Sequence, residues 1–168
     1  MGENVIRRIL IHHSYTQDLD TTFSWRDILL DHMGLVPWSR WLDPPKGPGS
    51  MSYIGYQAGN ELMRGVYTNM YGRPEWWVGG HCVHQSMNSQ SFGFCFIGNF
   101  DDAPPCEAQL RAAVRGVIAP LYSRKGWPLT EVGQRIVGHG EITKDGRSCP
   151  GKLFPMETLR TMVKEELT

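Results

Sequence analysis

The sequence lacks long apolar runs and has no excess of charge. Its 168 residues include 17 Lys plus Arg and 17 Asp plus Glu. We therefore expect no nucleic-acid partner and no attraction to an anionic membrane. No stretch reaches the roughly 18 consecutive apolar residues of a transmembrane helix, so we expect no membrane insertion. The first residues turn charged after a short apolar pair, unlike a signal peptide. This predicts a protein made in the cytoplasm of the producing cell.

Cysteine is also scarce. The four cysteines, Cys82, Cys95, Cys106 and Cys149, are too few and too unevenly spaced for a disulfide framework, so we expect reduced thiols. The chain has no internal repeat and no low-complexity tract. Its length is that of one domain able to bury a core without cross-links. We predict a single domain over residues 1–168 and a monomer.

Hydrophobic periodicity predicts alternating strands and helices. Uninterrupted apolar runs indicate buried strands, and apolar residues three and four apart indicate amphipathic helices. The expected strands cover residues 5–12, 53–63, 65–70 and 92–97, and the expected helices cover residues 25–33, 107–125 and 156–167. Pro120 predicts a kink near the end of the second helix. Residues 35–51, rich in Pro and Trp, predict a long surface loop, and loops of this length are usually functional.

One short loop has the composition of a metal site. His139 follows the apolar end of a predicted strand, and nine residues separate it from Cys149. Gly146 and the pair Pro150-Gly151 allow the turns that such a return requires. Imidazole and thiolate together suit zinc, which takes three protein ligands in catalytic sites. The third ligand must come from elsewhere, and we place it at His12, where the first strand ends.

The other histidines have simpler interpretations. His13 should point to the opposite face of the strand from His12, which favours packing or a supporting hydrogen bond over metal binding. His32 is expected to be a core or surface side chain. His81 lies in a glycine-rich loop that could be a substrate groove or simply solvated. A second metal site at Cys82 and His84 is disfavoured because no further ligand pair is nearby.

Five ordered motifs lie within residues 9–159. They are apolar-His12-x-Ser14-x-Thr16; Ile54-Gly55-Tyr56; Gly72-Arg73-Pro74 with Val78-Gly79-Gly80-His81; Ser91-Phe92-Gly93 ending in Gly98-Asn99-Phe100; and Gly138-His139 with Cys149-Pro150-Gly151. In this order the chain resembles the zinc-dependent N-acetylmuramoyl-L-alanine amidases shared by phage endolysins and peptidoglycan recognition proteins. The resemblance implies the ligand set His12, His139 and Cys149.

The resemblance also implies a catalytic pair, Tyr56 and Arg147, the latter where many members carry lysine. Activated water would attack the amide that joins muramic acid to L-alanine. Tyr56 can donate hydrogen bonds or relay a proton, whereas the permanently charged Arg147 can only stabilise negative charge. We expect the peptidoglycan or muropeptide substrate to contact His81, Trp77 and Asn88. Trp76 and Trp77 could equally be core residues.

One departure from the family pattern concerns acid–base chemistry. Some members place a glutamate in the strand where this chain has Cys95, which we expect to fill the core. Either Tyr56, Arg147 and zinc suffice, which we favour, or Glu141 contributes as a base or as a partner of a ligand. Glu141 could also be a solvated loop carboxylate.

These observations together predict a single α/β domain with a central mixed β-sheet flanked by helices and a zinc site at the strand ends. We expect a phage or prophage endolysin that hydrolyses peptidoglycan after release, without a separate wall-binding domain. A binding-only peptidoglycan recognition module and a zinc peptidase acting on the stem peptide are the alternatives. The presence of all three ligands argues against the first.

Overall fold

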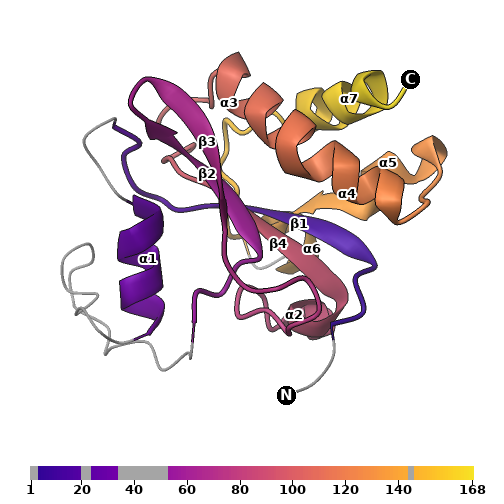
Figure 1. The fold of residues 1–168 in the computed structure, drawn as a ribbon, viewed down its shortest axis with the longest axis horizontal. Coiled ribbons are helices and arrows are strands. Elements are labelled where there is room, and N and C mark those ends of the chain that lie inside the picture. The colour runs from indigo at the N-terminus through magenta and orange to yellow at the C-terminus, as the bar shows by residue number, and fades with distance from the viewer. Residues whose placement is uncertain (1–3, 20–23, 34–52, 144–145) are drawn as a thin grey trace.

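A computed structural model describes residues 4–19, 24–33, 53–143 and 146–168, so the expected loop at 35–51 lies outside the described residues. A five-stranded sheet in the order β3-β2-β4-β1-β5 forms the centre (Figure 1). Its strands are β1 Arg8–His13, β2 Ala58–Met63, β3 Val66–Tyr71, β4 Ser91–Phe96 and β5 Ile136–Gly138. β1 is parallel to β4 and β5, β2 is parallel to β4, and β2 and β3 are the one antiparallel pair among the described strands. The mixed sheet is confirmed.

Helices cover both faces of the sheet. Figure 1 shows α3, α4 and α7 on one side and α1 on the other. The helical segments are α1 Ser24–His32, α2 Met87–Gln90, α3 Glu107–Ala113, α4 Ala119–Arg124, α5 Val132–Arg135, α6 His139–Thr143 and α7 Met156–Glu166, with 3-10 turns at His84–Ser86 and Leu129–Glu131. Within the described part of the chain, no helix has the length and apolar character needed to span a membrane.

The predicted helix over 107–125 is interrupted. A π-helical turn, Val114–Ile118, separates α3 from α4. It ends two residues before Pro120, which has no N–H to continue the helical hydrogen-bond ladder. Gly116 in this turn lets β3 approach, because a Cβ there would lie 2.0 Å from Asn69 Nδ2. The Asn69 amide donates to the carbonyl of Ala112 at 2.8 Å.

The predicted hairpin is present, but its first strand starts five residues later than expected, at Ala58. The preceding backbone uses its hydrogen-bonding groups elsewhere. The Arg73 guanidinium donates to the carbonyl of Ile54 at 2.6 Å, and the N–H and carbonyl of Gly55 bond to His32 and to Gly80. The turn of the hairpin has positive φ at Arg64 (52°) and Gly65 (77°), the geometry of a two-residue type I′ connection.

Candidate metal centre

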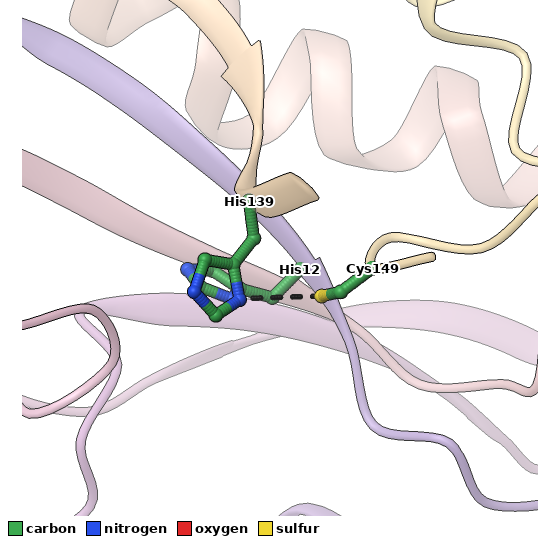
Figure 2. Close-up of side chains that lie close together, drawn as sticks. All are labelled: His12, His139 and Cys149. Atoms are coloured by element: carbon green, nitrogen blue, oxygen red, sulfur yellow. Dashed lines mark hydrogen bonds between the residues drawn. The ribbon is translucent and has the colours of Figure 1, made fainter. Parts of the chain in front are cut away.

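The three predicted ligands meet at the carboxyl edge of the parallel strands. His12 is the penultimate residue of β1, and His139 directly follows β5. Their donor atoms and that of Cys149 all lie within 4.8 Å of one another. Figure 2 shows the three side chains converging. His12 Nδ1 lies 3.8 Å from Cys149 Sγ. Because β1 and β5 are parallel neighbours, residues at their ends arrive at the same edge.

This donor set fits a zinc ion. Burial lowers the pKa of His12 well below its usual value, so the imidazole is a neutral donor. Burial raises the pKa of the Cys149 thiol to about 12, so a thiolate there needs a cation beside it. Bond lengths at tetrahedral zinc would place donors roughly 3.3–3.8 Å apart, and His12 Nδ1 lies 3.8 Å from Cys149 Sγ. Among the described residues, no other group of three or more His, Cys, Asp or Glu side chains is arranged to hold a metal.

Two features hold the Cys149 loop against α6 and against the segment that follows β4. The Gly140 N–H donates to the carbonyl of Cys149 at 2.6 Å, and a Cβ at Gly140 would lie 2.5 Å from the carbonyl oxygen of Arg147. The Asp101 carboxylate accepts the Lys152 N–H at 2.8 Å and the Ser148 hydroxyl at 2.7 Å. These two bonds, the backbone one first, hold the pKa of Asp101 below its usual value. No motif or periodicity in the sequence marks this clamp at Asp101.

Glu141 is engaged in structural bonds. Its carboxylate accepts the N–H of Gly138 at 2.5 Å and the Arg160 guanidinium at 2.8 Å. Arg160 also donates to the carbonyl of Ile136 at 2.9 Å. The pair therefore ties α7 to β5 and to the short helix that begins with His139. This geometry favours a supporting role for Glu141 over that of a base.

Tyr56 packs beside the ligands. Its ring centroid lies 5.2 Å from that of His12 and 6.0 Å from that of His81. Burial, followed by the nearby Cys95 and Cys149, raises the pKa of its phenol well above 10. Tyr56 is therefore a neutral hydrogen-bond donor next to the candidate metal centre.

A cavity of about 530 Å³ opens beside the centre. Its lining residues are Arg73, Gly79, Gly80, His81, Cys82, Val83, His84, Asn88, His139 and Arg147. Two of the predicted substrate contacts, His81 and Asn88, are therefore in the lining, together with Arg147. Trp77 is not among these residues; its carbonyl accepts the Gln57 side chain at 3.2 Å. Trp76, by contrast, is 65% exposed. The substrate roles themselves stay predictions.

The sequence predicted the packing role of His13 but not the hydrogen bond of His32. His13 accepts the Phe100 N–H at 3.3 Å and stacks on that ring, so the expected packing role is confirmed. His32 anchors α1 to the segment before Tyr56, because its Nδ1 accepts the N–H of Gly55 at 2.9 Å. Burial, followed by Arg73, lowers the pKa of His32 to about 4. No sequence signal marks this bond.

Known proteins that match this chain belong to the family that its motifs resemble. A family model described as N-acetylmuramoyl-L-alanine amidase matches residues 2–152. N-acetylmuramoyl-L-alanine amidases of Homo sapiens and Sus scrofa are 34% identical over 90 residues and 38% identical over 91 residues. Each alignment covers 54% of this chain but only 14% of the relative.

Solved structures share the fold. The N-acetylmuramoyl-L-alanine amidase LysC from Clostridium intestinale URNW has a TM-score of 0.64 at 19% identity, over 96% of this chain and 87% of that one. Bumblebee PGRP-SA has a TM-score of 0.66 at 23% identity, over 99% and 86%. In the PGRP-LCa and PGRP-LCx ectodomain complex with tracheal cytotoxin, the match has a TM-score of 0.61 at 22% identity, over 98% and 86%.

Proposed function

Because the chain belongs to the N-acetylmuramoyl-L-alanine amidase family, we propose that it is a zinc-dependent hydrolase of peptidoglycan that cleaves the amide between N-acetylmuramic acid and L-alanine. The observation that carries this proposal is the convergence of His12, His139 and Cys149 within 4.8 Å. A module that only binds peptidoglycan has no need for a thiol and two imidazoles in this arrangement.

The chemistry divides among few groups. Bound zinc would supply Lewis-acid polarisation of the scissile carbonyl and activation of water. Tyr56, which stays neutral, can donate a hydrogen bond to the developing oxyanion or pass a proton to the leaving amine. Arg147, in the cavity lining, can only stabilise negative charge. Glu141 is occupied by Arg160, so Tyr56 and Arg147 remain the catalytic residues that we propose.

The substrate is a peptidoglycan strand or muropeptide lying in the cavity beside His139. The tracheal cytotoxin complex of a related fold supports a muropeptide ligand for this chain. We assign the chain to a monomeric phage or prophage endolysin, a role supported by the endolysin from Clostridium intestinale URNW with a TM-score of 0.60. Residues 1–168 would then form one catalytic domain that acts on the wall after release.

Product analysis tests the proposal. Purified cell walls are digested with the full chain, with and without a chelator, and the metal content of the same preparation is measured. The expected products are peptides with free N-terminal L-alanine and intact glycan strands, formed only without the chelator. New amines on another residue would show a zinc peptidase instead. Zinc binding and wall binding without cleavage would show a recognition module.

A further inference from the structure

The His81 ring fits into a cradle of two glycines. His81 lies between β3 and the turn at His84–Ser86 and is 9% exposed. A Cβ at Gly79 or at Gly93 would lie 2.5 Å from its Cδ2 atom. The side-chain oxygen of Asn88 accepts the His81 N–H at 2.8 Å and so holds its backbone. Strand and loop are both shaped to admit this ring.

The ring is directed at a candidate metal ligand. His81 Nδ1 lies 3.1 Å from His12 Nε2, and the two ring planes are nearly perpendicular at 77°. The other nitrogen of His12, Nδ1, faces Cys149 (Figure 2). The two nitrogens of His12 thus have separate partners, Cys149 on one side and His81 on the other.

Protonation explains why an imidazole occupies the cradle. An imidazole that binds a cation through Nδ1 carries its remaining proton on Nε2, and that proton needs an acceptor. His81 Nδ1 is placed to accept it. The other nitrogen of His81, Nε2, is buried and has no hydrogen-bond partner among the described residues. A buried nitrogen without a partner is destabilising. The position therefore keeps an imidazole because of the hydrogen bond that Nδ1 can accept.

We propose that His81 is a positioning residue that fixes the ring orientation and the proton position of the metal ligand His12. This inference rests on the proposed function, since it assumes that His12 binds zinc. It changes the predicted role of His81 from substrate contact to support of the metal centre.

A matched pair of variants tests it. His81→Asn keeps an acceptor near the position of Nδ1, whereas His81→Leu has a similar size and no acceptor. Loss of a bond to a zinc-bound histidine typically costs about 10- to 100-fold in metal affinity. We expect that loss for His81→Leu and about threefold or less for His81→Asn, measured on the full chain by competition with a chromophoric chelator. Thermal unfolding of the metal-free proteins gives the structural effect separately.

Nuclear magnetic resonance of the zinc-loaded wild-type protein tests the same bond without a mutation. We expect a slowly exchanging proton on His12 Nε2 and a nitrogen–nitrogen coupling across the bond to His81 Nδ1. A purely structural role for His81 would produce neither signal. A proton on His81 Nδ1 instead of His12 Nε2 would overturn the proposal, and this readout stands even if the leucine variant does not fold.

The affinity series also separates this inference from the proposed function. Equal zinc affinity of His81→Leu and wild type, with a raised KM for muropeptide, would return His81 to substrate contact and overturn the proposal. A wild-type protein that binds zinc but releases no L-alanine would instead overturn the hydrolase assignment, while the affinity ratio would still support the positioning role.

Discussion

The two faces of strands β1 and β4 are built from different residues. The face toward α3, α4 and α7 carries large apolar side chains, each at most 6% exposed: Ile9, Ile11, Phe92, Phe94 and Phe96. The opposite face carries Gly93, Cys95 and His12, with His12 and Cys95 in register on adjacent strands. Small residues on this second face leave room for Tyr56 and His81. Because successive side chains of a strand point to opposite faces of the sheet, one face packs in the core and the other carries the candidate metal centre.

The helices are attached to the two faces by different means. On the face that carries Phe92, Phe94 and Phe96, here called the phenylalanine face, α7 contributes Leu159 and Val163 to the apolar core. On the face that carries His12, here called the histidine face, α1 is held partly by polar bonds. The buried Glu61 carboxylate of β2 accepts the backbone N–H groups of Ser24 and Trp25, and His32 at the other end accepts from Gly55. We infer that the first face mainly supplies stability and that the second places side chains for chemistry.

Removing the proposed metal ligand Cys149 should give the largest effect, a loss of zinc binding that is confined to the histidine face. Cys149→Ser replaces a thiolate by a hydroxyl that is a poor zinc ligand, and we expect zinc affinity and wall hydrolysis to fall by about 10³-fold or more. Metal analysis and turbidity loss measure both. Cys106→Ser, at an exposed position before α3, is the matched control and should leave both unchanged. Full zinc occupancy in Cys149→Ser would remove Cys149 from the site.

A substitution that creates a cavity under the phenylalanine face should lower stability and leave zinc affinity unchanged. Phe94 is fully buried, and its ring lies 4.9 Å from that of Phe96. Phe94→Ala should lower the free energy of unfolding by about 3–5 kcal/mol, measured by denaturant titration. The folded fraction should keep its zinc affinity. Cys95→Ala, one residue away on the other face, should cost about 1 kcal/mol. A larger loss for Cys95→Ala than for Phe94→Ala would contradict the division between the faces.

Tyr56 allows metal binding to be separated from turnover. Tyr56→Phe keeps the ring that packs against His12 and removes the hydroxyl. We expect zinc occupancy to stay the same and kcat to fall by about 10²-fold, the usual effect of losing a general acid or base. Tyr71→Phe, at an exposed position on β3, is the control. Wild-type turnover in Tyr56→Phe would show that the hydroxyl takes no part in the reaction.

The Asp101 clamp should give a smaller effect. Asp101→Ala removes both bonds that flank Cys149, but it leaves the thiol and the Gly140 contact in place. We expect zinc affinity to fall about 10-fold, as for other residues that orient a ligand. The adjacent Asp102→Ala is the control, because the one hydrogen bond described for the Asp102 side chain is to Asn99. Unchanged affinity in Asp101→Ala would show that the loop holds Cys149 without the clamp.

Local sequence patterns predict the candidate ligands but not the hydrogen bonds that support them. Periodicity and motif order predicted the strand that carries His12 and the strand end that precedes His139, because strand ends and residue types that bind metals leave local signals. The bonds between His81 and His12 and between His32 and Gly55 join residues 69 and 23 positions apart, so they depend on the packing of the sheet. Residues 53–57 have the composition of a strand, yet Arg73 and His32 bind their backbone. Local pattern cannot reveal such a competitor.

The His32 bond should make stability depend on pH. The pKa of His32 is about 4 in the folded chain, below its ordinary value of 6.5. Between these values the unfolded chain binds a proton that the folded chain excludes. The free energy of unfolding should therefore fall as pH drops from about 6.5 toward 4, by at most about 1.4 kcal/mol per pH unit for this proton.

A matched pair isolates that contribution from the other buried histidines. His32→Asn can accept the Gly55 N–H without titrating, so its metal-free unfolding free energy should fall less between pH 7 and pH 5 than that of the wild type. His32→Leu has no acceptor and should be less stable than His32→Asn at both pH values. Urea unfolding at the two pH values measures this. Equal pH slopes in wild type and His32→Asn would mean that His32 takes up its proton without loosening α1. The polar attachment of the histidine face would then not be the acid-sensitive part of the fold.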